Sequence, residues 1–236
     1  MGDDKHYDNE IRQLLTVGQQ ISTVMGSTTV SPLYMQLFMN QAVDEQRKTT
    51  ETAVVGWPVE VQRVFRALQK LSISSVTRLY RVSPDYYAWP LYERALGVGA
   101  PSPFHLCKTV VMGNTRWRTG DSTPRYVCVV VQYMHTINAQ ALADEVRAMD
   151  GNKVPKKRFN FRLAEGAEEM TGFAHNGVAP VGMAMEIPVI LCAAIAELKP
   201  PVLWVGAGAV DFKMAMPIDS FVAATACSVC DISVPL

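Results

Sequence analysis

The feature that most constrains this chain is the alternation of short apolar runs with amphipathic segments from Pro58 to the carboxyl end. Apolar runs bounded by turn residues are typical of strands, and spacings of three and four are typical of helices. Strands are predicted over residues 75–82, 105–112, 126–134, 189–193, 202–205 and 231–234. Helices are predicted from Pro58 onward and over residues 87–96, 138–149, 164–171 and 219–226. Strands interleaved with helices predict an α/β fold in which a sheet is flanked by helices.

The amino-terminal quarter has a different pattern, which predicts two helices. Apolar residues recur at helical spacing between Ile11 and Met25, and the pair Ser31-Pro32 is a good start for a second helix. The polar residues 44–52 are predicted to form a linker. Two helices cannot bury their apolar faces alone, so we expect them to dock on the main body, on a second copy or on another protein. The predicted domains are a helical extension with its linker at 1–57 and an α/β domain at 58–236.

Charge and cysteine usage exclude several classes of protein. The chain has 22 Lys+Arg and 22 Asp+Glu, so any contact with nucleic acid must be local. Five cysteines at irregular spacing indicate reduced thiols. The longest apolar run, residues 187–198, contains Pro188 and Glu197 and is too short to cross a bilayer. We therefore expect a cytoplasmic protein without a membrane segment.

Neither a metal site nor a common nucleotide site is evident. Cys227 and Cys230 have the spacing of half a zinc knuckle, but no second pair accompanies them. Gly206 and Gly208 follow an apolar strand without the third glycine of a dinucleotide-binding loop, so a tight turn between strands is the favoured interpretation. The chain also lacks a Gly-x-Ser-x-Gly nucleophile elbow. No metal and no cofactor are expected.

Three other features are candidates for function. Residues 171–182 contain three glycines and a proline, which predicts a rigid loop that a ligand can approach closely, although most such loops are only turns. Lys108 lies among apolar residues of a predicted strand, where it either extends to water or lines a polar pocket.

The third feature is a basic segment at residues 153–162. Five cations lie in ten residues, with Phe159 and Phe161 between them. Such a segment can bind phosphates while its aromatic rings stack on bases, or it can be a solvated loop with two core phenylalanines. The candidate tRNA-binding residues are Lys153, Lys156, Lys157, Arg158 and Arg162.

Four stretches in this order together resemble the YbaK/prolyl-tRNA synthetase-associated editing family of aminoacyl-tRNA deacylases. They are HLCKTVVM at 105–112, the run from EEMTGF at 168–173 to GVAPVG at 177–182, IPVI at 187–190, and LWVGAG at 203–208 with Asp211 downstream. The resemblance covers the chain from about Pro58 to its end. It implies a YbaK-like mixed sheet flanked by helices, with the amino-terminal helices as an addition.

The resemblance also implies roles for individual residues. Lys108 stands at the family's essential lysine, which is thought to hold the 3′ end of the charged tRNA. Gly177 and Pro180 stand in the Gly-x-x-x-Pro loop, whose amides are thought to hold the aminoacyl ester. The residues implied to bind substrate are Asn176, Val178, Ala179, Gly206, Gly208 and Asp211. Asn176 replaces the first glycine of that loop, but asparagine accepts a positive φ better than most residues.

Two functions from different classes follow. In the first, the chain hydrolyses mischarged tRNA, with Ala- or Cys-tRNA(Pro) as the expected substrate. An aminoacyl ester is already activated, so a positioned water and oxyanion donors suffice, without a protein nucleophile. In the second, the chain is a non-catalytic tRNA-binding or scaffold subunit whose amino-terminal helices recruit an aminoacyl-tRNA synthetase.

Overall fold

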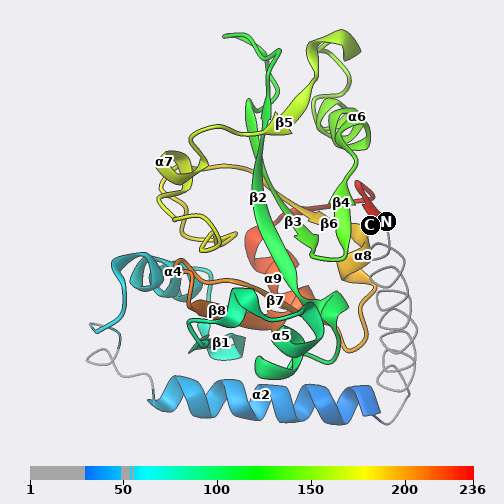
Figure 1. The fold of residues 1–236 in the computed structure, drawn as a ribbon. Helices are drawn as coiled ribbons and strands as arrows, with labels where there is room; N and C mark the ends of the chain where they lie inside the picture. Colours follow the sequence, from blue (N-terminus) through cyan, green and yellow to red (C-terminus); the bar gives the residue numbers. More distant parts are fainter. Residues whose placement is uncertain (1–29, 49–53, 55) are drawn as a thin grey trace, which may run out of the picture.

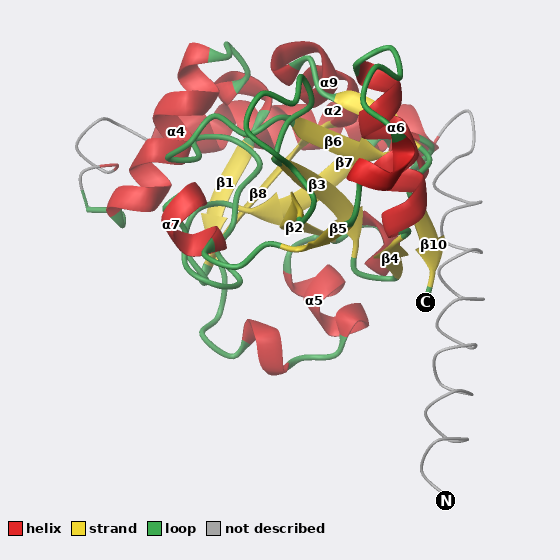
Figure 2. Cartoon of the chain, turned by 90° about the horizontal axis from the view of Figure 1, so that it is seen from above, coloured by secondary structure: helices red, strands yellow, loops and turns green. Residues whose placement is uncertain are grey.

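The computed structural model describes residues 30–48, 54 and 56–236, and it has a mixed α/β fold with helices flanking the sheets (Figure 1). The first predicted helix, between Ile11 and Met25, lies outside the described residues. Seen from above, helices lie around a centre made of strands (Figure 2). The prediction of a mixed sheet flanked by helices is confirmed.

The larger sheet has five strands in the order β5-β2-β3-β6-β9. Its strands are β2 (Cys107–Asn114), β3 (Tyr126–Gln132), β5 (Phe161–Leu163), β6 (Val189–Cys192) and β9 (Ser228–Cys230). β2 runs antiparallel to β3 and β5, whereas β3–β6 and β6–β9 are parallel pairs. The valines of β3 are completely buried, as expected for a central strand covered on both faces.

A smaller sheet has the order β1-β8-β7 and consists of antiparallel pairs. Its strands are β1 (Arg78–Arg81), β7 (Val202–Gly206) and β8 (Phe212–Pro217). β7 and β8 form a hairpin whose turn contains Gly208, which confirms the predicted tight turn. A bridge between Leu106 and Trp204 joins this sheet to the start of β2. A third, two-stranded sheet pairs β4 (His135–Ile137) with β10 (Ser233–Pro235).

The helices begin and end where local chemistry predicts. α4 (Val59–Lys70) starts directly after Pro58 and buries Val61, Val64 and Leu68. α6 (Ala139–Met149) is capped by the Asn138 side chain, which accepts hydrogen bonds from the amides of residues 140 and 141. The other helices are α5 (Leu91–Gly97), α7 (Ala167–Thr171), α8 (Ala193–Ala196) and α9 (Ile218–Thr225). None of the described helices is both long and apolar enough to cross a membrane.

Several predicted boundaries were wrong. The linker predicted over 44–52 is partly helical, because α2 (Val30–Lys48) continues to Lys48. The segment 75–82 begins with a 3₁₀ turn before β1, and the helix predicted over 87–96 begins only after Pro90, which has no amide hydrogen to donate. The strand predicted over 231–234 begins at Ser233. The prediction missed β4, β5, β8 and β9.

Helix α2 packs directly against the smaller sheet, where it lies across one end of the molecule (Figure 1). Phe38 is 2% exposed, and its ring meets the Trp204 ring edge-on at 6.1 Å between centroids. The Tyr34 hydroxyl donates a hydrogen bond of 3.0 Å to the Gly99 carbonyl. These contacts place one face of α2 in the same apolar cluster as β7 and α5.

This packing predicts that Phe38→Ala lowers the free energy of unfolding by about 3–5 kcal/mol, because truncation leaves a cavity beside Trp204. Leu37→Ala, on the exposed face of the same helix, should change it by about 0.5 kcal/mol or less. Urea unfolding of both variants measures the difference. Equal destabilisation by the two substitutions would contradict the docking of α2.

Candidate functional site

Lys108 lies near the start of β2 and is half buried. Its Nζ lies 5.9 Å from the centroid of the Tyr133 ring, a distance at which a cation is attracted to an aromatic face. Burial lowers the pKa of Lys108 below its usual value. Cys107 and Thr109, on either side of it, are buried, so the side chain of Lys108 points away from theirs. The ammonium of Lys108 is therefore partly covered by an aromatic ring, and its side chain lies on the opposite face of β2 from Cys107 and Thr109.

Three tyrosines lie between Lys108 and the glycine-bearing loop. The rings of Tyr86 and Tyr87 meet edge-on at 5.4 Å, and the phenol groups of Tyr87 and Tyr133 interact. The Tyr87 hydroxyl donates a hydrogen bond of 2.7 Å to the Asn176 carbonyl. Burial raises the pKa of all three phenols, so they stay protonated at neutral pH. This chain of contacts connects Lys108 with the loop.

The loop at residues 172–182 is held at both ends by one arginine from α4. The Arg63 guanidinium donates hydrogen bonds of 2.7 Å to the carbonyls of Gly172 and Gly182. It also lies 4.5 Å from the centroid of the Phe173 ring. Sequence reasoning missed Arg63, because nothing in a helical surface pattern distinguishes it from a solvated arginine.

Inside the loop, Asn176 has φ +65°, so asparagine occupies the left-handed region as expected. The Gly177 amide donates to the Ala174 carbonyl and is therefore used by the turn itself. Among the described residues we find no acceptor for the amides of Val178 and Ala179. Val178 is partly exposed, whereas Ala179 is completely buried, so the Val178 amide is the one that a ligand can reach.

The β7–β8 turn packs on this loop backbone to backbone. The Gly208 amide donates a hydrogen bond of 2.9 Å to the Gly177 carbonyl. A Cβ atom at Gly206 would lie only 2.6 Å from the Val178 carbonyl oxygen, so a larger residue would force the two segments apart. The structure thus brings Gly206 and Gly208 together with Gly177 and Val178. Pro180 is buried immediately after this contact.

Asp211 has a different environment from the one expected. Its carboxylate forms an ion pair of 2.5 Å with Arg81, and its carbonyl accepts a hydrogen bond from the Val82 amide. Both contacts attach the β7–β8 turn to β1. Asp211 therefore stabilises the wall of the pocket, and its charge is already matched by Arg81.

Lys213 is a site residue that sequence reasoning missed. It lies in β8, is 5% exposed, and donates hydrogen bonds to the Tyr87 hydroxyl at 3.0 Å and the Val210 carbonyl at 2.9 Å. Its Nζ lies 4.6 Å from the centroid of the Tyr87 ring. Burial lowers the pKa of Lys213 to about 7, although Asp211 opposes the shift. The sequence pattern did not indicate that Lys213 is buried, because β8 was not predicted as a strand.

The pocket enclosed by these groups is small. Lys213, the three tyrosines and Gly206 are among the residues that line a cavity of about 10 Å³, which is room for about one water molecule. Lys108 and the loop at 172–182 are not among the residues that line it. An aminoacyl group would therefore enter only if tyrosine side chains moved aside. In the described part of the chain, no group of three or more His, Cys, Asp or Glu side chains is arranged to hold a metal ion.

The basic segment lies at the other end of β2, because Phe161 pairs with Asn114. Lys153, Lys157 and Arg162 are exposed, whereas Lys156 pairs with Asp144 at 2.9 Å and Arg158 pairs with Asp121 at 2.6 Å. Phe159 and Phe161 are buried in the core. Stacking of bases on these two rings is therefore excluded, and the alternative of two core phenylalanines is correct.

The buried Lys213 predicts a pH dependence of stability. Its pKa is about 7 in the folded chain and about 10.4 in the unfolded chain, so the unfolded chain binds more protons between these values. Compared with Lys213→Met, the free energy of unfolding of the wild type should rise with pH in this window, by at most about 1.4 kcal/mol per pH unit.

Urea unfolding at several pH values measures this difference. The exposed-lysine variant Lys70→Met is the control and should differ from wild type by the same amount at every pH. A pH-independent difference for Lys213→Met would show that Lys213 keeps its ordinary pKa.

Comparison with known proteins supports the fold. No protein-family model and no curated protein sequence matches the chain. The solved structure of "a putative trans-editing enzyme for prolyl tRNA synthetase" is similar with a TM-score of 0.60 and 19% identity, covering 76% of this chain and 99% of that one. The hypothetical protein APE2540 is similar with a TM-score of 0.56 and 19% identity, covering 73% and 99%. A scaffold protein used for epitope backbone grafting is similar with a TM-score of 0.57 and 18% identity, covering 76% of this chain and 100% of the scaffold. The chain therefore shares the fold of these three solved structures.

Proposed function

We propose that this chain is an aminoacyl-tRNA deacylase that hydrolyses the ester of mischarged tRNA, with Ala- or Cys-tRNA(Pro) as the substrate. The observation that carries the proposal is the chain of contacts from Lys108 through Tyr133 and Tyr87 to the carbonyl of Asn176. These contacts connect a cationic amine with a glycine-bearing loop, although 68 residues separate Lys108 from Asn176 in the sequence. The similar fold of the trans-editing protein agrees with this function.

The groups present suit ester hydrolysis. The Lys108 ammonium would hold the 3′-terminal phosphate or ribose of the tRNA, since a partly buried amine binds an anion more strongly than an exposed one does. The amide of Val178, which has no acceptor among the described residues, would donate to the carbonyl oxygen as negative charge develops on it. Water would add to the ester carbon, and the ester C–O bond would break to release the amino acid and the ribose hydroxyl.

Lys213 and Tyr87 would act as positioning residues. Lys213 donates to the Tyr87 hydroxyl, which in turn donates to the Asn176 carbonyl, so the two side chains fix the direction of the loop backbone. Preorganised donors are effective because they need no rearrangement during the reaction. In this proposal the amino-terminal region binds a synthetase. The contact surface is the exposed face of α2, opposite the face on which Phe38 packs.

A second candidate function is a non-catalytic tRNA-binding or scaffold subunit. The cavity of about 10 Å³ favours it, because an aminoacyl group does not fit without side-chain movement. Asn176 also adds a side chain where the editing family that the sequence resembles has glycine. The two functions differ in whether the chain accelerates deacylation at all.

Lys108→Ala should lower the rate of deacylation of Ala- and Cys-tRNA(Pro) by about 100-fold, because the reacting ester loses its positioning cation. The assay follows the release of labelled amino acid from mischarged tRNA, with Lys70→Ala as the control for loss of an exposed lysine. The control should keep the wild-type rate. If mischarged tRNA decayed at the same uncatalysed rate with wild type and with Lys108→Ala, the deacylase function would be refuted and the scaffold function would remain.

A further inference from the structure

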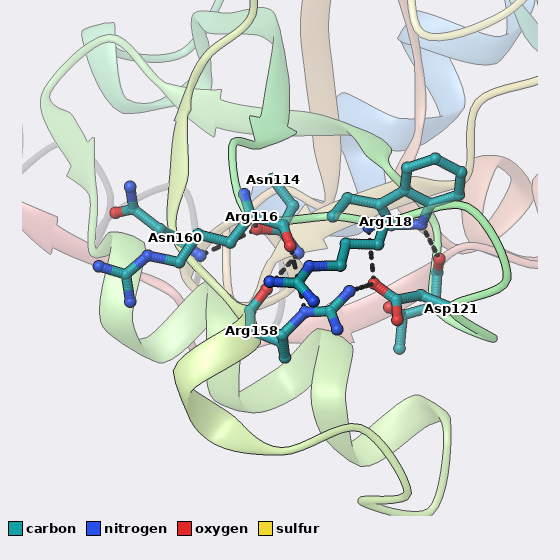
Figure 3. A network of polar contacts seen from close by, with 8 residues as sticks. Asn114, Arg116, Arg118, Asp121, Arg158 and Asn160 are labelled. Atoms are coloured by element: carbon teal, nitrogen blue, oxygen red, sulfur yellow. Dashed lines mark hydrogen bonds and ion pairs between the residues drawn. The ribbon is translucent and has the colours of Figure 1, made fainter.

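A second cationic site lies at the far end of β2, where the strand reaches its hairpin with β3 (Figure 3). We call it the arginine pocket. Its volume is about 360 Å³, and it is lined by Thr115, Arg116, Trp117, Arg118, Lys157 and Arg158. Only Lys157 and Arg158 belong to the basic segment that the sequence singled out.

The two halves of the arginine pocket are joined by one buried side chain, Asn114, which is 4% exposed. Its Oδ1 accepts hydrogen bonds from the amides of Arg116 at 3.1 Å and Asn160 at 3.0 Å. Its Nδ2 donates to the Arg158 carbonyl at 2.9 Å. Three hydrogen bonds of the Asn114 side chain thus hold the segments 114–118 and 157–160 together.

A second set of contacts fixes the floor of the arginine pocket. Arg158 donates to Asp121 at 2.6 Å, and these two side chains are only 21% and 13% exposed. The same carboxylate oxygen accepts a hydrogen bond of 2.8 Å from the Arg118 amide. Trp117 donates through Nε1 to the Thr123 carbonyl at 2.9 Å. Arg158 is therefore a structural residue, and its charge is largely matched by Asp121.

The remaining cations are presented to solvent. Arg116 uses one nitrogen to donate to the Lys157 carbonyl at 3.1 Å, which leaves the rest of its guanidinium exposed. For the Arg118 guanidinium and the Lys157 ammonium we find no partner in residues 56–236. The arginine pocket with Asp121 contains four cations and one carboxylate. Guanidinium groups with surplus positive charge, on a backbone held by Asn114 and Asp121, match the oxygen atoms of a phosphate group.

We propose that the arginine pocket binds a backbone phosphate of RNA. The identification of this RNA as tRNA rests on the proposed function. Asn114 follows Lys108 by six residues on β2, so the arginine pocket lies roughly 20 Å along the strand from Lys108. A tRNA whose 3′ end lies at Lys108 would then place a phosphate of its acceptor arm in the arginine pocket.

The contacts available indicate which part of RNA is bound. Phe159 and Phe161 are buried and offer no face to a base. Trp117 is fixed by its own hydrogen bond. The exposed groups are charged nitrogens, which contact phosphate oxygens without distinguishing bases. The arginine pocket should therefore contribute affinity that is independent of nucleotide sequence and sensitive to salt.

The test is binding of uncharged tRNA by the full chain, measured over a range of KCl concentrations. The double variant Arg118→Gln/Lys157→Gln removes two charges without removing any side-chain hydrogen bond of the pocket. Loss of two phosphate contacts should weaken binding and reduce the slope of log K against log salt by about 1 to 2. Lys70→Gln/Lys199→Gln, which removes two exposed lysines elsewhere, should leave the slope unchanged.

Unchanged affinity and slope in the double variant would overturn the proposal. A second result would also overturn it: wild type and the double variant bind tRNA equally, but only wild type binds inorganic phosphate. The arginine pocket would then be a site for free phosphate and not for RNA. Uncharged tRNA separates this result from the deacylase assay. Lys108→Ala should lower kcat for hydrolysis, whereas the double variant should raise KM and keep kcat.

Discussion

The candidate site depends on one close approach between two stretches of backbone. The Gly208 amide donates to the Gly177 carbonyl, and the Cα of Gly206 lies against the Val178 carbonyl with no space for a side chain. A Cβ atom at Gly208 would also lie 2.8 Å from the carbonyl of Glu60 in α4. Three segments from distant parts of the sequence therefore meet at positions that only glycine satisfies. Without this contact the loop would have no fixed position relative to β2.

Much of the fold could be predicted because its central strands are apolar throughout. β2, β3, β6 and β7 are buried on both sides, so their runs are nearly continuous in hydrophobic residues. β8 was missed because Lys213 and Pro217 interrupt its apolar pattern, although all of its residues are buried. A lysine inside such a strand is tolerated only where aromatic faces and hydrogen-bond acceptors surround its ammonium, and no local pattern shows these.

The candidate site was predicted in part for a related reason. Lys108 and the loop at 172–182 stand out locally, one as a cation among apolar residues and the other by its glycines. Arg63 and Tyr87 do not stand out, because their roles come from partners 119 and 126 residues away in the sequence. The same holds for Arg116, whose neighbour Lys157 is 41 residues away. A sequence pattern identifies residues that differ from their neighbours in the sequence. Residues that match their neighbours can be identified as site residues only from their partners in the folded chain.

Lys108 and Lys213 also share an electrostatic property that bears on the binding of an anion beside them. Burial lowers the pKa of both Lys108 and Lys213, and the nearby carboxylate of Asp211 is already paired with Arg81. An anion that enters the pocket favours the charged form of each amine, so it raises both pKa values. By linkage, such an anion must bind more tightly as the pH falls toward 7, because Lys213 takes up a proton with it.

In the two proposals together, β2 would act as a spacer between two anion-binding positions. Its hydrogen bonds with β3 fix Lys108 opposite Val131 and Gly113 opposite Tyr126, so the separation of its two ends cannot adjust to a ligand. A small anion can occupy either position but cannot connect them. A polymer with phosphates at regular intervals can occupy both, and its second contact is then made at the high effective concentration of an intramolecular step. Rigid spacing of this kind selects a long polyanion over a free nucleotide, even though neither position recognises a base.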